Sequence, residues 1–116
     1  MSQLIWRLAF WTLVLTTVWL SLITAALIPT ALHFWDKAQH ALGFAGLAYL
    51  GMMAYPGQIL KVLLGLMLLG VGIECAQWMT AWRQGDWQDW VADCFGLAIG
   101  APAWCLMNRQ FKFRTK

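Results

Sequence analysis

Four apolar runs follow one another along this chain, and no other feature constrains its fold as strongly. Each run is about 20 residues long, which is the length that a helix needs to cross the hydrocarbon core of a bilayer. In lipid, an open sheet would leave backbone N–H and C=O groups unpaired, so we predict that each run is a helix. The predicted spans cover residues 8–27, 36–55, 59–78 and 89–108.

The composition excludes a soluble globular domain. Of the 116 residues, 61% are hydrophobic and only 11% are charged, so there is too little polar surface to coat a soluble particle of this size. The loops between the runs are short, and consecutive helices are therefore expected to be antiparallel neighbours. The sequence predicts one all-α domain over residues 1–116, an antiparallel bundle of four transmembrane helices with a basic tail at residues 109–116.

The distribution of basic residues predicts the orientation of this bundle. With four spans both termini lie on one side, and that side also carries Arg7, Lys61 and the basic residues of the tail. The opposite side carries only Lys37 and Arg83. Because lysine and arginine concentrate in cytoplasmic loops, we predict that both termini are cytoplasmic. The tail directly follows a span, so we interpret it as a segment that lies on anionic lipid headgroups, and we expect no nucleic-acid partner.

The polar residues inside the runs fall at the outer end of the predicted bundle. His40 lies four residues inside the second span, Asp93 four inside the fourth, and Glu74 four before the end of the third. At a helical rise of about 1.5 Å per residue, all three lie about 6 Å below the outer boundary. Charged groups in lipid cost a few kcal/mol each, and they commonly mark functional sites. If the three helix faces converge, these residues form one polar pocket open to the outside.

Further polar residues share helix faces with these three, because they lie three or four positions away. They are Asp36 beside His40, Gln77 beside Glu74, and Asp89 beside Asp93.

Three interpretations of this set are open. In the first, the groups only satisfy one another. His40 then binds Glu74 or Asp93, and Lys37 and Arg83 bind neighbouring acids. In the second, a buried carboxyl beside His40 transfers protons, while Lys37 and Arg83 hold an anionic group such as a phosphate.

In the third interpretation, His40, Glu74 and Asp93 bind a divalent metal. Neither an H-x-x-x-H nor an H-E-x-x-H pattern is present, so we predict no metal and no cofactor. The chain also lacks Walker, Rossmann and nucleophile-elbow patterns, and the sequence leaves open whether it is an enzyme.

Three motifs contain these polar residues in a fixed order. They are Asp36-Lys37-x-x-His40, Glu74-x-x-Gln77 followed by Arg83, and Asp89-x-x-x-Asp93-x-x-Gly96-x-x-x-Gly100. The pattern resembles the VanZ-like family of small bacterial membrane proteins, whose signature is D-K-x-x-H, E-x-x-Q with a following arginine, and D-x-x-x-N-x-x-G. The resemblance covers residues 35–100. One position departs from it: Asp93 stands where the family usually has asparagine, and this extra acid changes the proton balance of the pocket or invites a cation.

The resemblance implies a protein of the bacterial cell envelope, located in the cytoplasmic (inner) membrane and affecting tolerance to envelope-active antibiotics such as teicoplanin. It implies no mechanism. The positions that match the family are Asp36, Lys37, His40, Glu74, Gln77, Arg83, Asp89, Gly96 and Gly100.

The leading hypothesis is an outward-facing pocket that binds a lipid-linked or phosphate-bearing envelope component and, if the protein is an enzyme, modifies it. Glu74 and His40 are then the proton-transfer pair. The predicted substrate-binding residues are Asp36, Lys37, Gln77, Arg83, Asp89 and Asp93.

The alternative is a non-catalytic membrane adaptor or scaffold whose polar network is structural. A proton-coupled channel is a further option, but nothing comparable lines the inner half of the predicted bundle. The expected partners are membrane lipids, a lipid-linked substrate and, because glycines are abundant in the spans, a second copy of the chain.

Overall fold

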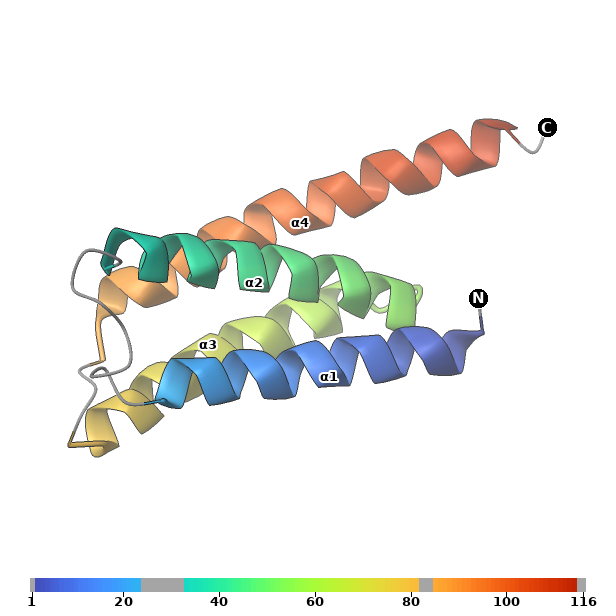
Figure 1. Ribbon diagram of the computed structural model, residues 1–116. Helices are drawn as coiled ribbons and strands as arrows, with labels where there is room; N and C mark the ends of the chain where they lie inside the picture. The colour runs from blue at the N-terminus through green and yellow to red at the C-terminus, as the bar shows by residue number, and fades with distance from the viewer. Residues whose placement is uncertain (1, 24–32, 82–84, 115–116) are drawn as a thin grey trace.

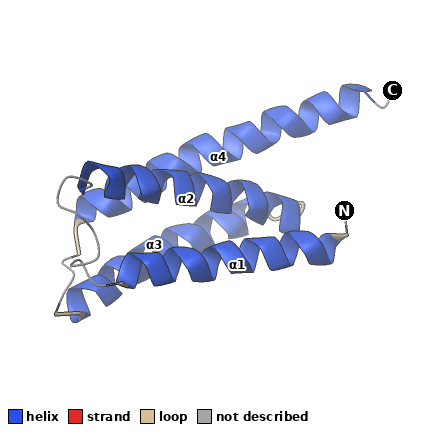
Figure 2. Ribbon diagram, in the orientation of Figure 1, coloured by secondary structure: helices blue, strands red, loops and turns tan. Residues whose placement is uncertain are grey.

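The computed structural model describes residues 2–23, 33–81 and 85–114. Within these residues the chain forms four α-helices (Figure 1) and no strand (Figure 2). The prediction of an all-α fold is therefore confirmed. The helices are α1 (Gln3–Leu22), α2 (His33–Ala54), α3 (Ile59–Met79) and α4 (Trp87–Arg114).

All four helices differ somewhat in extent from the predicted spans, and α1 and α4 differ most. α1 begins at Gln3, before the predicted start at residue 8, and it ends at Leu22, because Ile23 has an extended backbone with φ −63° and ψ 155°. The last predicted residues of this span, 24–27, lie outside the described residues. α4 continues to Arg114, so residues 109–114, which we predicted as a tail, extend the last helix. Apolar length alone does not mark these ends, since a helix continues into polar sequence when no breaker stops it.

Three of the helices are long and apolar enough to cross a membrane: α1, α3 and residues Trp87–Arg109 of α4. Within the described residues α2 does not reach this criterion, although it contains 22 residues. Its first turns carry Lys37, Gln39 and His40, which lower its mean hydropathy. The structure therefore supports a membrane protein, while the fourth span and the cytoplasmic termini stay predictions.

Consecutive helices run antiparallel, as Figure 1 shows. The beginning of α1 and the end of α4 lie at one end of the molecule, and the beginnings of α2 and α4 lie at the other, beside the end of α3. The second half of α4 diverges from the other three helices. The most extensive helix–helix contact joins α2 to α4, followed by that between α1 and α2.

The apolar core lies mainly between α1, α2 and α3, and Leu97 of α4 also contributes to it. Its centre is Phe44 and Leu47 of α2, which are fully buried, and Phe10 of α1 and Leu66 of α3 pack around them. Many other large apolar side chains are exposed, among them Leu15, Trp19, Leu68 and Phe95. A single small bundle cannot bury that many apolar side chains, so this surface is suited to lipid.

α4 approaches α2 through two buried glycines. A Cβ atom on Gly96 would overlap the carbonyl oxygen of Ala41, and one on Gly100 would overlap that of Ala45. Small residues four positions apart let the two backbones touch, as in small-x-x-x-small helix pairs of membrane proteins. This contact sets the register of α4 against α2, because both glycines lie against the backbone of the same short segment of α2, between Ala41 and Ala45.

Candidate functional site

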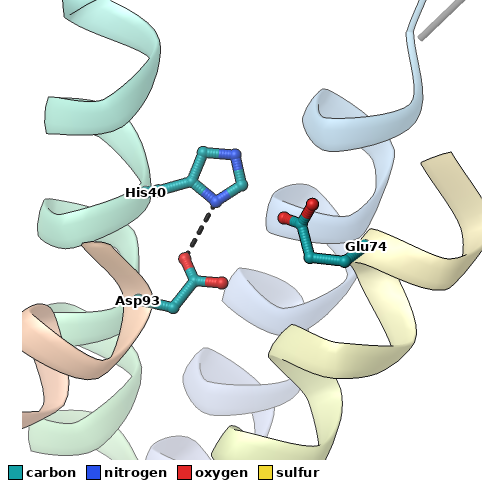
Figure 3. Close-up of side chains that lie close together, drawn as sticks. All are labelled: His40, Glu74 and Asp93. Atoms are coloured by element: carbon teal, nitrogen blue, oxygen red, sulfur yellow. Dashed lines mark hydrogen bonds and ion pairs between the residues drawn. The ribbon is translucent and has the colours of Figure 1, made fainter. Parts of the chain in front are cut away.

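Three ionisable side chains meet near the end of the bundle that is remote from the start of α1. Figure 3 shows His40 of α2, Asp93 of α4 and Glu74 of α3 turned toward one another. His40 Nδ1 lies 2.8 Å from Asp93 Oδ1, and the two residues are 5% and 2% exposed. One nitrogen or oxygen atom from each of the three residues lies within 4.8 Å of those from the other two. The structure thus brings together three residues that the sequence places at equal depths.

The helix contact described above explains why His40 and Asp93 meet. Asp93 lies one turn before Gly96, and His40 directly precedes Ala41, so the Gly96–Ala41 contact places both side chains at the same level. From the third helix, Gly70 leaves room for the carboxylate, since a Cβ there would lie 3.0 Å from Asp93 Oδ2. The pairing of His40 with Asp93 is therefore a consequence of backbone contact.

Each carboxylate of the cluster has one satisfied oxygen. Glu74 Oε2 accepts a hydrogen bond of 2.7 Å from the backbone N–H of Asp86, and Asp93 Oδ1 lies beside His40. The other oxygens, Glu74 Oε1 and Asp93 Oδ2, are buried and have no hydrogen-bond partner in the described part of the chain. A buried acceptor without a donor costs about 1–3 kcal/mol. The cluster therefore offers two acceptor atoms that the described residues leave unsatisfied.

Lys37 lies one helical turn before His40 in α2, between two acids. Its Nζ is 3.1 Å from Asp86 Oδ2 and 3.1 Å from Asp89 Oδ1. Asp89 is buried, whereas the Lys37 side chain is 41% exposed. The backbone N–H of Gln88, and after it Lys37, hold the pKa of Asp86 below its usual range. Because the single positive charge of Lys37 is shared between two carboxylates, little of it is available to an anionic ligand.

Gln77 lies on the α1 side of α3. It is 1% exposed, and its Nε2 donates a hydrogen bond of 2.8 Å to the backbone carbonyl of Ser21. Its Oε1 is buried and has no hydrogen-bond partner within the described residues. Gln77 therefore ties the end of α1 to the end of α3.

Two predicted residues cannot be placed in the site. Arg83 lies outside the described residues, and so does the side chain of Asp36, although Asp36 itself belongs to α2.

Of the other predicted residues, Lys37 and Asp89 form an ion pair beside the cluster. The predicted proton-transfer pair, Glu74 and His40, lies within the cluster, where Asp93 is hydrogen-bonded to His40.

A pocket of about 240 Å³ between α1 and α2 reaches His40. Three leucines and three hydroxyl side chains contribute to its lining. They are Leu13, Leu20 and Leu42, together with Thr16, Thr17 and Ser21. Thr16 and Ser21 bond to backbone carbonyls one turn earlier, as hydroxyls in apolar helices commonly do. Sequence reasoning missed this pocket, and the signal for it was the group of hydroxyl residues within the first apolar run.

A family model described as VanZ/LLP1 matches residues 3–108 of the chain. The comparison with curated proteins found no match, and neither did the comparison with solved structures. The matched segment includes the whole cluster and the pocket beside it.

Proposed function

The chain belongs to the VanZ/LLP1 family, and on this premise we propose that it is a cell-envelope membrane protein that binds a lipid-linked, phosphate-bearing component. The polar head of this component lies at His40, Glu74 and Asp93, and its apolar chain lies between α1 and α2. The observation that carries the proposal is the continuity of the α1–α2 pocket with His40.

The lining of the pocket suits a ligand with an apolar part and a polar part. Leu13, Leu20 and Leu42 offer apolar surface, while His40 lies where the pocket meets the polar cluster. α1 is a candidate membrane span, so the pocket opens beside a helix that lies in lipid. A ligand that is anchored in the membrane therefore reaches the cluster without leaving the bilayer.

The cluster supplies the chemistry of a proton-transfer site. The hydrogen bond to Asp93 orients the imidazole of His40, as a carboxylate does for many catalytic histidines. Glu74 approaches from α3 with one oxygen unsatisfied, and that oxygen accepts a hydrogen bond from a hydroxyl of the head group. In an enzyme of this design, His40 and Glu74 exchange protons with the ligand.

The proposal includes the predicted topology. α2 is the second of four spans, because Lys37 and His40 in its first turns bond to acids at the start of α4. The termini are cytoplasmic, which places the cluster at the outer leaflet of a bacterial cytoplasmic membrane. A head group bound there belongs to an envelope lipid, and its capture changes tolerance to antibiotics such as teicoplanin.

A non-catalytic adaptor is the second candidate. The hydrogen bond from Gln77 to the end of α1 and the ion pairs of Lys37 favour it, because they join α3 to α1 and α2 to the start of α4 at one end of the bundle. In that case the polar network only fixes helix register, and the protein holds no ligand.

The test is native mass spectrometry of the gently solubilised protein, with phosphate analysis of any bound lipid. Gly43 lines the pocket, and a Cβ there has its nearest neighbour in Thr17 at 3.8 Å, so Gly43→Leu fills the pocket with little local strain. Gly65→Leu is the matched control, because a Cβ at Gly65 meets nothing within 4 Å. We expect a phosphate-bearing lipid on the wild type and on Gly65→Leu, and its loss from Gly43→Leu.

Retention of the same lipid by Gly43→Leu would refute the pocket as its binding site. If the wild type carries no lipid, the adaptor becomes the better account.

A further inference from the structure

We propose that His40, Glu74 and Asp93 bind one divalent cation of the first transition series, for which Zn²⁺ is the probe. The three residues come from three different helices and present one potential ligand atom each within 4.8 Å of one another (Figure 3). The sequence raised this set as one interpretation but predicted no metal, because no short metal-ligand motif connects residues that are 34 and 19 positions apart (40 to 74, 74 to 93).

The ligand types select the class of cation. Imidazole nitrogen suits zinc, iron, nickel and copper, whereas magnesium and calcium prefer oxygen ligands throughout. One histidine with two carboxylates leaves further positions open, as in catalytic zinc sites, which have three protein ligands. Bonds of about 2.1 Å to each ligand hold the ligand atoms within about 4.2 Å of one another, so the cluster contracts slightly on binding.

The unsatisfied oxygens point to a cation independently of the clustering. Glu74 Oε1 and Asp93 Oδ2 are buried acceptors without a donor in the described residues, and Asp93 is only 2% exposed. A dication bonds both oxygens at once and balances the two carboxylates. Leaving such charges uncompensated in a buried site is costly.

The other oxygen of Glu74 is already held in position, because the N–H of Asp86 bonds Glu74 Oε2. A partner of this kind orients a metal ligand and raises metal affinity. Glu74 therefore keeps one oxygen for the protein and one for the cation, while the cation takes the place of the proton between His40 and Asp93.

The cation also deepens the proposed function, on which this step rests: with the cation bound, Glu74 and His40 act as its ligands and no longer as a proton-transfer pair, and the cation contacts the head group. The described acids in and around the cluster are Glu74, Asp86, Asp89 and Asp93. Lys37 is bound to two of these four, Asp86 and Asp89. A phosphate is repelled by such a set unless a positive charge lies between. A dication with open positions supplies that charge and bonds a phosphate oxygen directly.

The experiment measures metal uptake by the purified full chain in detergent, without added lipid. The protein is stripped with a chelator, incubated with Zn²⁺, desalted and analysed by elemental mass spectrometry, and Co²⁺ absorption reports the ligand environment. We expect about one Zn²⁺ per wild-type chain. Affinity should fall by more than about tenfold in Glu74→Gln and Asp93→Asn, since even the loss of an outer-shell partner costs that much.

Asp86→Asn is the matched control. It removes one negative charge at the same end of the bundle, and its backbone N–H to Glu74 is unchanged. Equal uptake by wild type, Glu74→Gln and Asp93→Asn would overturn the proposal, and so would the absence of uptake by the wild type. A phosphate-bearing lipid on a protein that takes up no Zn²⁺ would leave the proposed function standing and remove only the cation.

Discussion

At the residue scale, single buried polar atoms join the helices at the end of the bundle that carries His40, Glu74 and Asp93, which we call the polar end. Asp93, Glu74 and Gln77 each have one side-chain atom that is bonded and one oxygen without a partner in the described residues. The bond of Asp93 to His40 connects α4 to α2, and the bond of Gln77 to Ser21 connects α3 to α1. The bond of Glu74 to the N–H of Asp86 holds the loop after α3 against that helix. The unbonded oxygens of Glu74 and Asp93 face the site. In the proposed site, the structural bonds and the ligand therefore use different oxygens of Glu74 and Asp93.

Gln77 provides a test of the structural half of this division. Gln77→Met keeps a similar volume but removes the donor to the Ser21 carbonyl. We expect the free energy of unfolding to fall by about 1 kcal/mol, the typical net worth of one hydrogen bond. The measurement is denaturant unfolding in detergent micelles. Zn²⁺ uptake is the internal control and should not change, because Gln77 offers no ligand; a loss of uptake would place Gln77 in the site.

At the element scale, the contact between α2 and α4 positions the site. Gly96 and Gly100 lie against the carbonyls of Ala41 and Ala45, and this contact brings Asp93 to His40. The beginning of α4 is held by Asp86, whose Oδ1 accepts a hydrogen bond of 2.9 Å from the backbone N–H of Gln88. A carboxylate in this position satisfies one of the unpaired N–H groups at the start of a helix.

Gly96→Ala tests the helix contact. The added methyl group meets backbone atoms of Ala41 that cannot rotate away, so α4 must move from α2. We expect a loss of about 1–3 kcal/mol in stability, typical of overpacking, together with weaker Zn²⁺ uptake. Gly72→Ala is the control, since a Cβ there meets nothing within 4 Å. If Gly96→Ala is as stable as Gly72→Ala, the two backbones do not touch.

Substitutions at Asp86 test whether its side chain caps the start of α4. Asp86→Ala removes the oxygen that accepts from Gln88 and should cost about 1 kcal/mol. Asp86→Asn keeps an accepting oxygen, and asparagine caps helices about as well as aspartate does. Both variants lose the ion pair with Lys37, so the difference between their melting temperatures isolates the cap. Equal melting temperatures would show that Asp86 does not cap α4.

At the scale of the whole molecule, the polar end and the end that carries the start of α1 differ in chemistry. The ion pairs of Lys37 and the buried cluster lie at the first, and the core of aromatic and aliphatic side chains continues toward the second. A membrane protein with this asymmetry presents its site to one side of the bilayer only.

Reporter fusions test this orientation. With four spans and cytoplasmic termini, we expect alkaline phosphatase to be active when fused in the connection after α3 and inactive when fused after α4. Fluorescent protein fusions should give the opposite result. Active phosphatase at the C-terminus would show either an inverted bundle or an α2 that does not cross the membrane.

Local properties of the sequence determined the helical fold and the common level of the polar residues along the bundle. Apolar length and the need to pair backbone groups in lipid depend only on neighbouring residues, so the four helices were predictable. The same holds for the common level of His40, Glu74 and Asp93, which follows from the helical rise. The ends of α1 and α4 were less predictable, because hydropathy does not mark where a helix stops.

Only the tertiary structure decided which groups meet. Three features depend on how the helices rotate and slide against one another. They are the hydrogen bond between His40 and Asp93, the bond of Gln77 to Ser21, and the pocket lined by Thr16 and Thr17. That register is set by contacts between residues more than 40 positions apart, such as Gly96 with Ala41. The sequence therefore places polar groups at one end of the molecule, and the packing of backbones turns three of them into a site.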